Sequence, residues 1–237
     1  MEDPQVTESF TARHHALLFA WIARAVVKRV GKTEGERVVR EAVRRYGEER
    51  GQRMRLRSEL NGDALTMAHY LAYGEWSVPT GWSESEVLQT VPHRKTHVLK
   101  CPWHTAWQEI GLMEFGRLYC VEIDEALVRG FNADLQLDVN GTLTNGSNYC
   151  EFVFHDMDGD SLIPAAPGRR VLGWDYHAGH LFTTVGAVVC DRLGEAGRES
   201  LDEALAAFAE AFGQAAAEVV VSYRGTDFSR LPEVTIE

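Results

Sequence analysis

Apolar residues recur every three or four positions along much of the chain, which is the spacing of amphipathic helices. In the N-terminal part this pattern runs from Phe10 to Val30, ends at Gly31 and then resumes. The pair Thr33 and Glu36 forms a capping box at the point where it resumes. The pattern predicts three helices in this part of the chain, over about 8–30, 34–59 and 63–73.

Two later segments have the pattern of β-strands. Residues 85–100 mix β-branched and polar residues around Pro92, which predicts two short strands or one interrupted edge strand. Residues 134–139 and 149–155 alternate apolar and polar positions on either side of a glycine-rich turn, which predicts a hairpin. Because strand and helix units do not alternate, we expect an α+β fold, with N-terminal and C-terminal helices packed on a small, mainly antiparallel sheet.

Further helices are predicted between and after these strands. One begins at Cys101-Pro102, and another covers Arg117 to Gly130 without a break. The C-terminal part is predicted to be helical from about His177, with a last helix opened by Ser200 and Glu203. A loop rich in Asp, Gly and Pro precedes it. We expect a single domain over 1–237, with this loop at 156–168. The residues from about 169 onward could also form a C-terminal helical appendage to that domain.

Composition limits the classes of function. The formal net charge of −11 argues against nucleic-acid binding, and no apolar run reaches the roughly 20 residues that a membrane-spanning helix needs. The N-terminus has no signal-peptide pattern, so we expect a cytoplasmic protein whose four cysteines are free thiols, metal ligands or catalytic groups. A homo-oligomer is compatible with these features.

Three cysteines and one aspartate are candidates for chemistry. Cys101 precedes a predicted helix, where the helix dipole favours a thiolate. Cys120 and Asp124 are four residues apart on a predicted helix and would share a face, so that the carboxylate could transfer protons. Cys150 falls on the apolar side of a predicted strand. Each of these positions alone is also compatible with a buried structural thiol.

Two histidines and a possible metal site complete the candidates. His177 and His180 are three residues apart and would share a helix face, as metal ligands or proton shuttles do, or as one capping and one core histidine. The spacing of the cysteines matches no zinc or iron–sulfur motif, yet Cys101, Cys120 and Cys150 could still assemble around an ion.

Taken together, these motifs resemble the L-2-amino-thiazoline-4-carboxylic acid hydrolase family. The resemblance spans most of the chain, and no single piece of it is specific. The positions that carry it are Tyr46-Gly47, Arg50-Gly51 with Arg53, Cys101-Pro102, Tyr119-Cys120 with Asp124, Gly146, Cys150 with Phe152, and the segment WDYHAGH at 174–180.

This resemblance implies a hydrolase that opens a cyclic amidine or amide C–N bond in a small, amino-acid-derived substrate with a carboxylate. A cysteine would attack, with Cys120 as first choice, and no cofactor is expected. Asp124, His177 or His180 would move protons, and Arg50, Arg53 and His104 would bind the substrate. The alternative is a domain without catalysis, similar to vinyl-reductase-type domains, whose cysteines hold an ion or line a ligand pocket.

Overall fold

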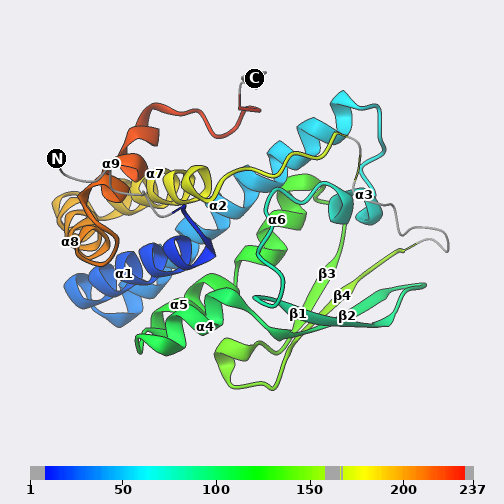
Figure 1. Cartoon of the computed structure of the whole chain (residues 1–237), viewed down its shortest axis with the longest axis horizontal. Coiled ribbons are helices and arrows are strands. Elements are labelled where there is room, and N and C mark those ends of the chain that lie inside the picture. Colours follow the sequence, from blue (N-terminus) through cyan, green and yellow to red (C-terminus); the bar gives the residue numbers. More distant parts are fainter. Residues whose placement is uncertain (1–8, 158–165, 167, 233–237) are drawn as a thin grey trace, which may run out of the picture.

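The computed structural model describes residues 9–157, 166 and 168–232, which fold into a group of helices flanked by one sheet (Figure 1). The expected α+β class is confirmed. The helices are α1 (Ala12–Val30), α2 (Lys32–Leu60), α3 (Met67–Ala72), α4 (Pro102–Glu109), α5 (Met113–Cys120), α6 (Ile123–Phe131), α7 (Trp174–Leu193), α8 (Glu195–Phe212) and α9 (Gln214–Ser222), with short 3₁₀ turns η1 (Leu143–Asn145) and η2 (Tyr223–Gly225).

The sheet has four antiparallel strands in the order β1-β2-β4-β3. They are β1 (Glu84–Gln89), β2 (Arg94–Lys100), β3 (Leu137–Asn140) and β4 (Cys150–Phe154). Both predicted strand pairs are therefore confirmed. Val98 pairs with Cys150, and β2 continues directly into Cys101 and α4, so the sheet brings two of the candidate thiols to the same end of adjacent strands.

The helices pack chiefly against one another. α1 lies against α2, α7 and α8, and α7 also packs on α2. α2 and α6 form the closest pair because glycines face each other between them: a Cβ added at Gly51 would collide with the Leu127 carbonyl oxygen, and one at Gly130 with that of Glu48. α6 also contacts β3 and so joins the helices to the sheet (Figure 1). Among the helices described, none is long and apolar enough to cross a membrane.

Several predicted helix boundaries are wrong. The single helix expected over 117–130 is two helices, because the backbone leaves the helical conformation at Glu122 (φ −131°). α5 packs chiefly on α1, with smaller contacts to α2 and α4, while α6 packs chiefly on α2, and this tertiary packing overrides a local sequence without Gly or Pro at the break. Cys120, the last residue of α5, is therefore on a different helix from Asp124, which lies in α6.

Glycines and threonines set other boundaries differently from the capping-box predictions. Gly31, at φ +86°, joins α1 to α2 directly, so Thr33 lies inside α2. Thr66 caps α3, which is shorter than predicted. Ser200 lies within α8, where its hydroxyl donates to the Ala196 carbonyl, and α9 was not predicted. Most of the expected loop at 156–168 lies outside the described residues.

Candidate functional site

The three candidate cysteines and Asp124 come together between α4, α5, α6 and the start of β4. Cys101 is the N-cap of α4, Cys120 ends α5, Asp124 lies in the first turn of α6, and Cys150 begins β4. They are mutually close enough that Cys101, Asp124 and Cys150 each raise the pKa of the Cys120 thiol. The prediction that they share one site is therefore met in space, although Cys120 and Asp124 reach it from different helices.

Burial keeps the thiols protonated. The α4 N-terminus lowers the pKa of Cys101 as expected, but burial has the larger effect and raises it to about 11. The backbone N–H groups of Trp103 and His104 oppose that rise. Burial also raises the pKa of Cys150 and, further, that of Cys120. A base is therefore needed to form any thiolate at this site.

The turn before β4 supplies polar contacts to two of the thiols. The Leu143 backbone N–H donates to Cys150 Sγ at 3.3 Å, and a side-chain hydrogen bond with Thr144 lowers the pKa of Cys120 against the effect of burial. Both residues lie in η1, which contacts α5. Sequence analysis missed them because nothing in the loop sequence shows which helix it contacts.

Asp124 is the group in this cluster that titrates near neutral pH. Burial raises its pKa to about 7, and the charge of Arg50 opposes the rise. A carboxyl group with this pKa exists in both protonation states at pH 7, as a general acid or base requires. The residue predicted to move protons therefore has the electrostatics for that role.

Arg50 is the buried cation closest to this chemistry. It is 3% exposed, its Nε has no hydrogen-bond partner, and Nε lies 3.9 Å from Glu75 Oε2, too far for a hydrogen bond. Its charge acts on Asp124 and on Tyr119, which precedes Cys120. A buried guanidinium that acts on Asp124 and whose Nε makes no hydrogen bond is suited to hold a carboxylate.

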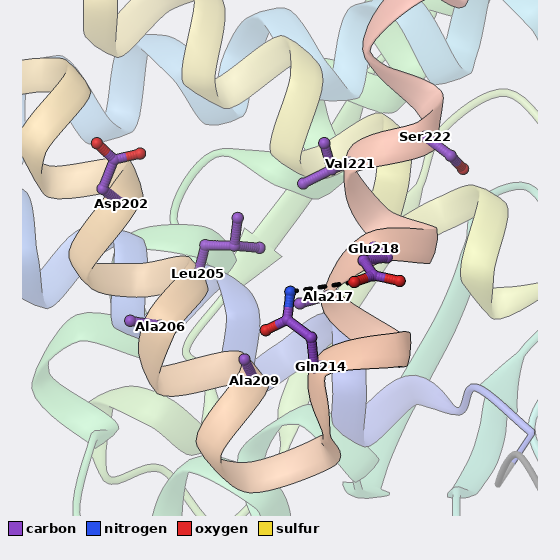
Figure 2. Close-up of a pocket in the computed structure, with 9 residues that line it drawn as sticks. All are labelled: Asp202, Leu205, Ala206, Ala209, Gln214, Ala217, Glu218, Val221 and Ser222. Carbon is purple, nitrogen blue, oxygen red and sulfur yellow. Dashed lines mark hydrogen bonds between the residues drawn. The ribbon is translucent and has the colours of Figure 1, made fainter.

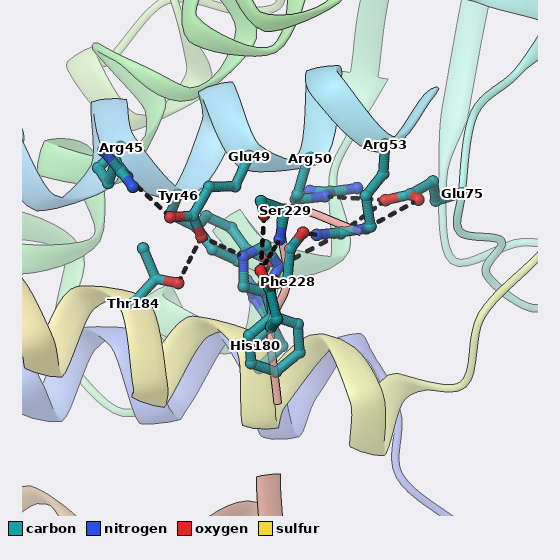
Figure 3. Close-up of polar contacts among 12 residues, drawn as sticks. Arg45, Tyr46, Glu49, Arg50, Arg53, Glu75, His180, Thr184, Phe228 and Ser229 are labelled. Atoms are coloured by element: carbon teal, nitrogen blue, oxygen red, sulfur yellow. Dashed lines mark hydrogen bonds and ion pairs between the residues drawn. The ribbon is translucent and has the colours of Figure 1, made fainter. Parts of the chain in front are cut away.

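Arg53, also predicted to bind substrate, is instead occupied by protein groups. Its Nη2 donates to Glu75 Oε2 at 2.8 Å, its Nε to Oε1 at 3.1 Å, and its Nη1 to the Phe228 carbonyl at 2.8 Å (Figure 3). Arg57 donates to Glu75 as well, at 2.6 Å. Glu75 has 0% exposure and is the acceptor on which this arginine group depends. Sequence analysis missed Glu75, since nothing near it in the sequence indicates its arginine partners.

The two α7 histidines, His177 and His180, contact the buried group formed by Arg53, Arg57 and Glu75. His180 Nε2 lies 2.9 Å from Glu49 Oε2 and its Nδ1 lies 3.3 Å from Arg53 Nη2, while the Phe228 ring stacks on the imidazole (Figure 3). His177 Nε2 contacts the Glu75 carbonyl at 3.2 Å, and its Nδ1 is buried without a partner. Burial lowers the pKa of both histidines well below the ordinary value, so both are neutral.

His104 and the surface grooves contribute less to the candidate site than the cysteines, Asp124 and Arg50. His104 lies on α4 next to the cysteines, half-buried, and burial lowers its pKa. An open groove of about 430 Å³ between α8 and α9 is lined by Leu205, Val221 and several alanines, and Gln214 donates a hydrogen bond to Glu218 on its α9 side (Figure 2). In the described part of the chain, no group of three or more His, Cys, Asp or Glu residues could hold a metal ion.

Comparison with known proteins gives one match. The family model for L-2-amino-thiazoline-4-carboxylic acid hydrolase matches residues 11–154. The matched region contains Arg50, Cys101, Cys120, Asp124 and Cys150 and ends before α7. No curated protein and no solved structure matches the chain.

Proposed function

Because this chain belongs to the L-2-amino-thiazoline-4-carboxylic acid hydrolase family, we propose that it is a cysteine-dependent hydrolase of a cyclic amidine or amide C–N bond. The substrate is a small, amino-acid-derived carboxylate. One observation carries the proposal: a carboxyl group with a pKa of about 7 lies among three thiols, beside an arginine whose Nε has no partner.

The reaction follows from these groups. The Asp124 carboxylate removes the proton from a cysteine Sγ, and the thiolate bonds to the amidine carbon, pushing the C=N electron pair onto nitrogen. The ring nitrogen takes that pair and the proton from Asp124. The exocyclic nitrogen then forms a C=N bond and loses a proton through Asp124 to the ring nitrogen, which leaves with the electron pair of the broken ring C–N bond. Asp124 next removes a proton from water, and the water oxygen bonds to the same carbon while the C=N pair moves to the exocyclic nitrogen, which takes that proton. Finally the added hydroxyl gives its proton to Asp124 and forms C=O as the C–S bond breaks, and Sγ takes the electron pair and the proton to regenerate the thiol.

The local electrostatics change the choice of nucleophile. Sequence analysis placed Cys120 first because of its spacing from Asp124, but the two residues lie on different helices. Two backbone N–H groups favour the thiolate of Cys101, whereas Cys120 has only the Thr144 contact and a larger rise in pKa. Cys101 is therefore the proposed nucleophile, and Cys120 and Cys150 lie near it.

Arg50 holds the substrate carboxylate in this proposal. Its guanidinium is buried, makes no hydrogen bond through Nε, and lies between the arginine group and Asp124. Arg53 and His180 hold their neighbours in place instead, because both already bond to protein acceptors. Binding the carboxylate at Arg50 would bring the attached ring toward Asp124 and the thiols that surround it.

A panel of substrates tests the proposal. Purified protein is incubated with L-2-amino-thiazoline-4-carboxylate, other cyclic amidines and amino-acid-derived lactams, and ring opening is measured by mass spectrometry. We expect turnover of at least one cyclic amidine that carries a carboxylate. Cys190→Ser is the matched control, since Cys190 lies on α7 near Arg198 and Arg224, away from the site. No turnover of any member, or loss of turnover in Cys190→Ser, would argue against the proposal.

A further inference from the structure

A chain of hydrogen bonds links three aromatic residues beside the proposed site. Trp103 Nε1 donates to His15 Nδ1 at 3.0 Å, and His15 Nε2 lies 2.9 Å from the Tyr46 hydroxyl. The three residues come from α4, α1 and α2, and all are buried: Trp103 is 7% exposed, His15 1% and Tyr46 0%. Trp103 is two residues from Cys101, so this chain begins at the helix turn that carries the proposed nucleophile.

The donors and acceptors along the chain can be assigned. An indole N–H can only donate, so His15 Nδ1 must accept and carries no proton. Burial and the nearby charge of Arg50 lower the pKa of His15 well below its ordinary value, so the ring is neutral and has one proton, on Nε2. His15 Nε2–H therefore donates to the Tyr46 oxygen, and Tyr46 must direct its own hydrogen elsewhere.

Tyr46 and Arg50 are one helical turn apart on α2 and project from the same face, toward α7 (Figure 3). The Arg50 guanidinium carbon lies 5.6 Å from the centre of the Tyr46 ring. Among the residues that the structure describes, none accepts the Tyr46 hydrogen and none accepts from Arg50 Nε. Two buried donors on one face thus lack an acceptor, which is costly unless a ligand supplies one.

We infer that Tyr46 and Arg50 together form a two-point site for the substrate carboxylate, and that His15 and Trp103 are positioning residues that make Tyr46 a donor. This inference rests on the proposed function for the identity of the ligand. One carboxylate oxygen accepts from Tyr46, and the other accepts from the guanidinium. Tyr46 and Arg50 together therefore distinguish a ring that carries a carboxylate from a ring that lacks one.

The test measures binding and requires no turnover. Thiazolidine-4-carboxylate carries the ring and carboxylate but no amidine carbon, and thiazolidine lacks the carboxylate. Calorimetry on the full chain gives the ratio of their dissociation constants. Tyr46→Phe keeps the ring and should weaken thiazolidine-4-carboxylate about tenfold to a hundredfold, with thiazolidine unchanged. Tyr176→Phe is the matched control, because it removes another buried tyrosine hydroxyl, one that has no hydrogen-bond partner and whose ring lies against Arg53.

A double-mutant cycle tests the positioning role. His15→Ala should weaken the carboxylate probe in the wild-type background but cause no further loss in Tyr46→Phe, because its effect acts through that hydroxyl. Additive losses would overturn the positioning role. Absence of carboxylate-dependent binding in the wild type, or equal affinity in folded Tyr46→Phe, would overturn the two-point site. If Tyr46-dependent binding holds while no amidine is hydrolysed, the proposed reaction fails and the binding site remains.

Discussion

The carboxyl group of Asp124 should make the stability of the fold depend on pH. Its pKa is about 7 in the folded protein against an ordinary value of 3.8. The folded state therefore binds more protons than the unfolded state between about pH 4 and pH 7, so this group lowers stability progressively as pH rises through that range. At 1.36 kcal/mol per pKa unit, the full penalty is at most about 4 kcal/mol and is reached above pH 7.

Asp124→Asn removes this titration and isolates its effect. Urea unfolding of wild type and variant is measured from pH 4 to pH 8, and the difference in free energy of unfolding is plotted against pH. The variant should gain stability relative to wild type as pH rises, by up to about 4 kcal/mol at pH 8 relative to pH 4. Asp134→Asn, at an exposed position, is the control. A difference between Asp124→Asn and wild type that stays constant with pH would refute the reasoning.

Two further changes test the packing that holds the site. Glu75→Gln leaves Arg53 and Arg57 without their buried carboxylate and should cost about 3–5 kcal/mol in urea unfolding, against little for exposed Glu84→Gln; a cost below about 1 kcal/mol would contradict this. Gly51→Ala forces α2 away from the Leu127 carbonyl and should lower the free energy of unfolding by about 1–3 kcal/mol, measured by thermal unfolding. Gly74→Ala is the control, because a Cβ at Gly74 contacts no other atom. Equal effects of the two substitutions would be inconsistent with the close packing of α2 and α6.

Local sequence patterns were sufficient for the parts of the fold that local chemistry decides. The apolar spacing predicted α1 and α2, the alternating residues around a glycine-rich turn predicted the β3–β4 hairpin, and Cys101-Pro102 predicted the start of α4. The break between α5 and α6 could not be predicted in this way. It depends on the two halves packing mainly against different helices, α1 and α2, and no glycine or proline marks it.

The candidate site likewise contains residues that local sequence predicted and residues that it did not. Cys101, Cys120, Asp124 and Cys150 were found from a family-like motif, but their pKa values depend on burial that only the folded chain creates. Three other residues were missed because their partners are distant in sequence: Glu75 pairs with arginines 18 and 22 residues away, and the Trp103–His15 bond spans 88 residues. Single-sequence patterns carry no signal at such separations.

The rate of ring opening in three cysteine variants tests the central claim most directly. The turnover number, kcat, for L-2-amino-thiazoline-4-carboxylate is measured with Cys101→Ser, Cys120→Ser and Cys150→Ser beside wild type, once each variant is shown to be folded. A serine hydroxyl is a far poorer nucleophile than a thiolate, so Cys101→Ser should lose several orders of magnitude in kcat. Loss only in Cys120→Ser or Cys150→Ser would move the nucleophile, and near-normal kcat in all three variants would contradict cysteine-dependent hydrolysis.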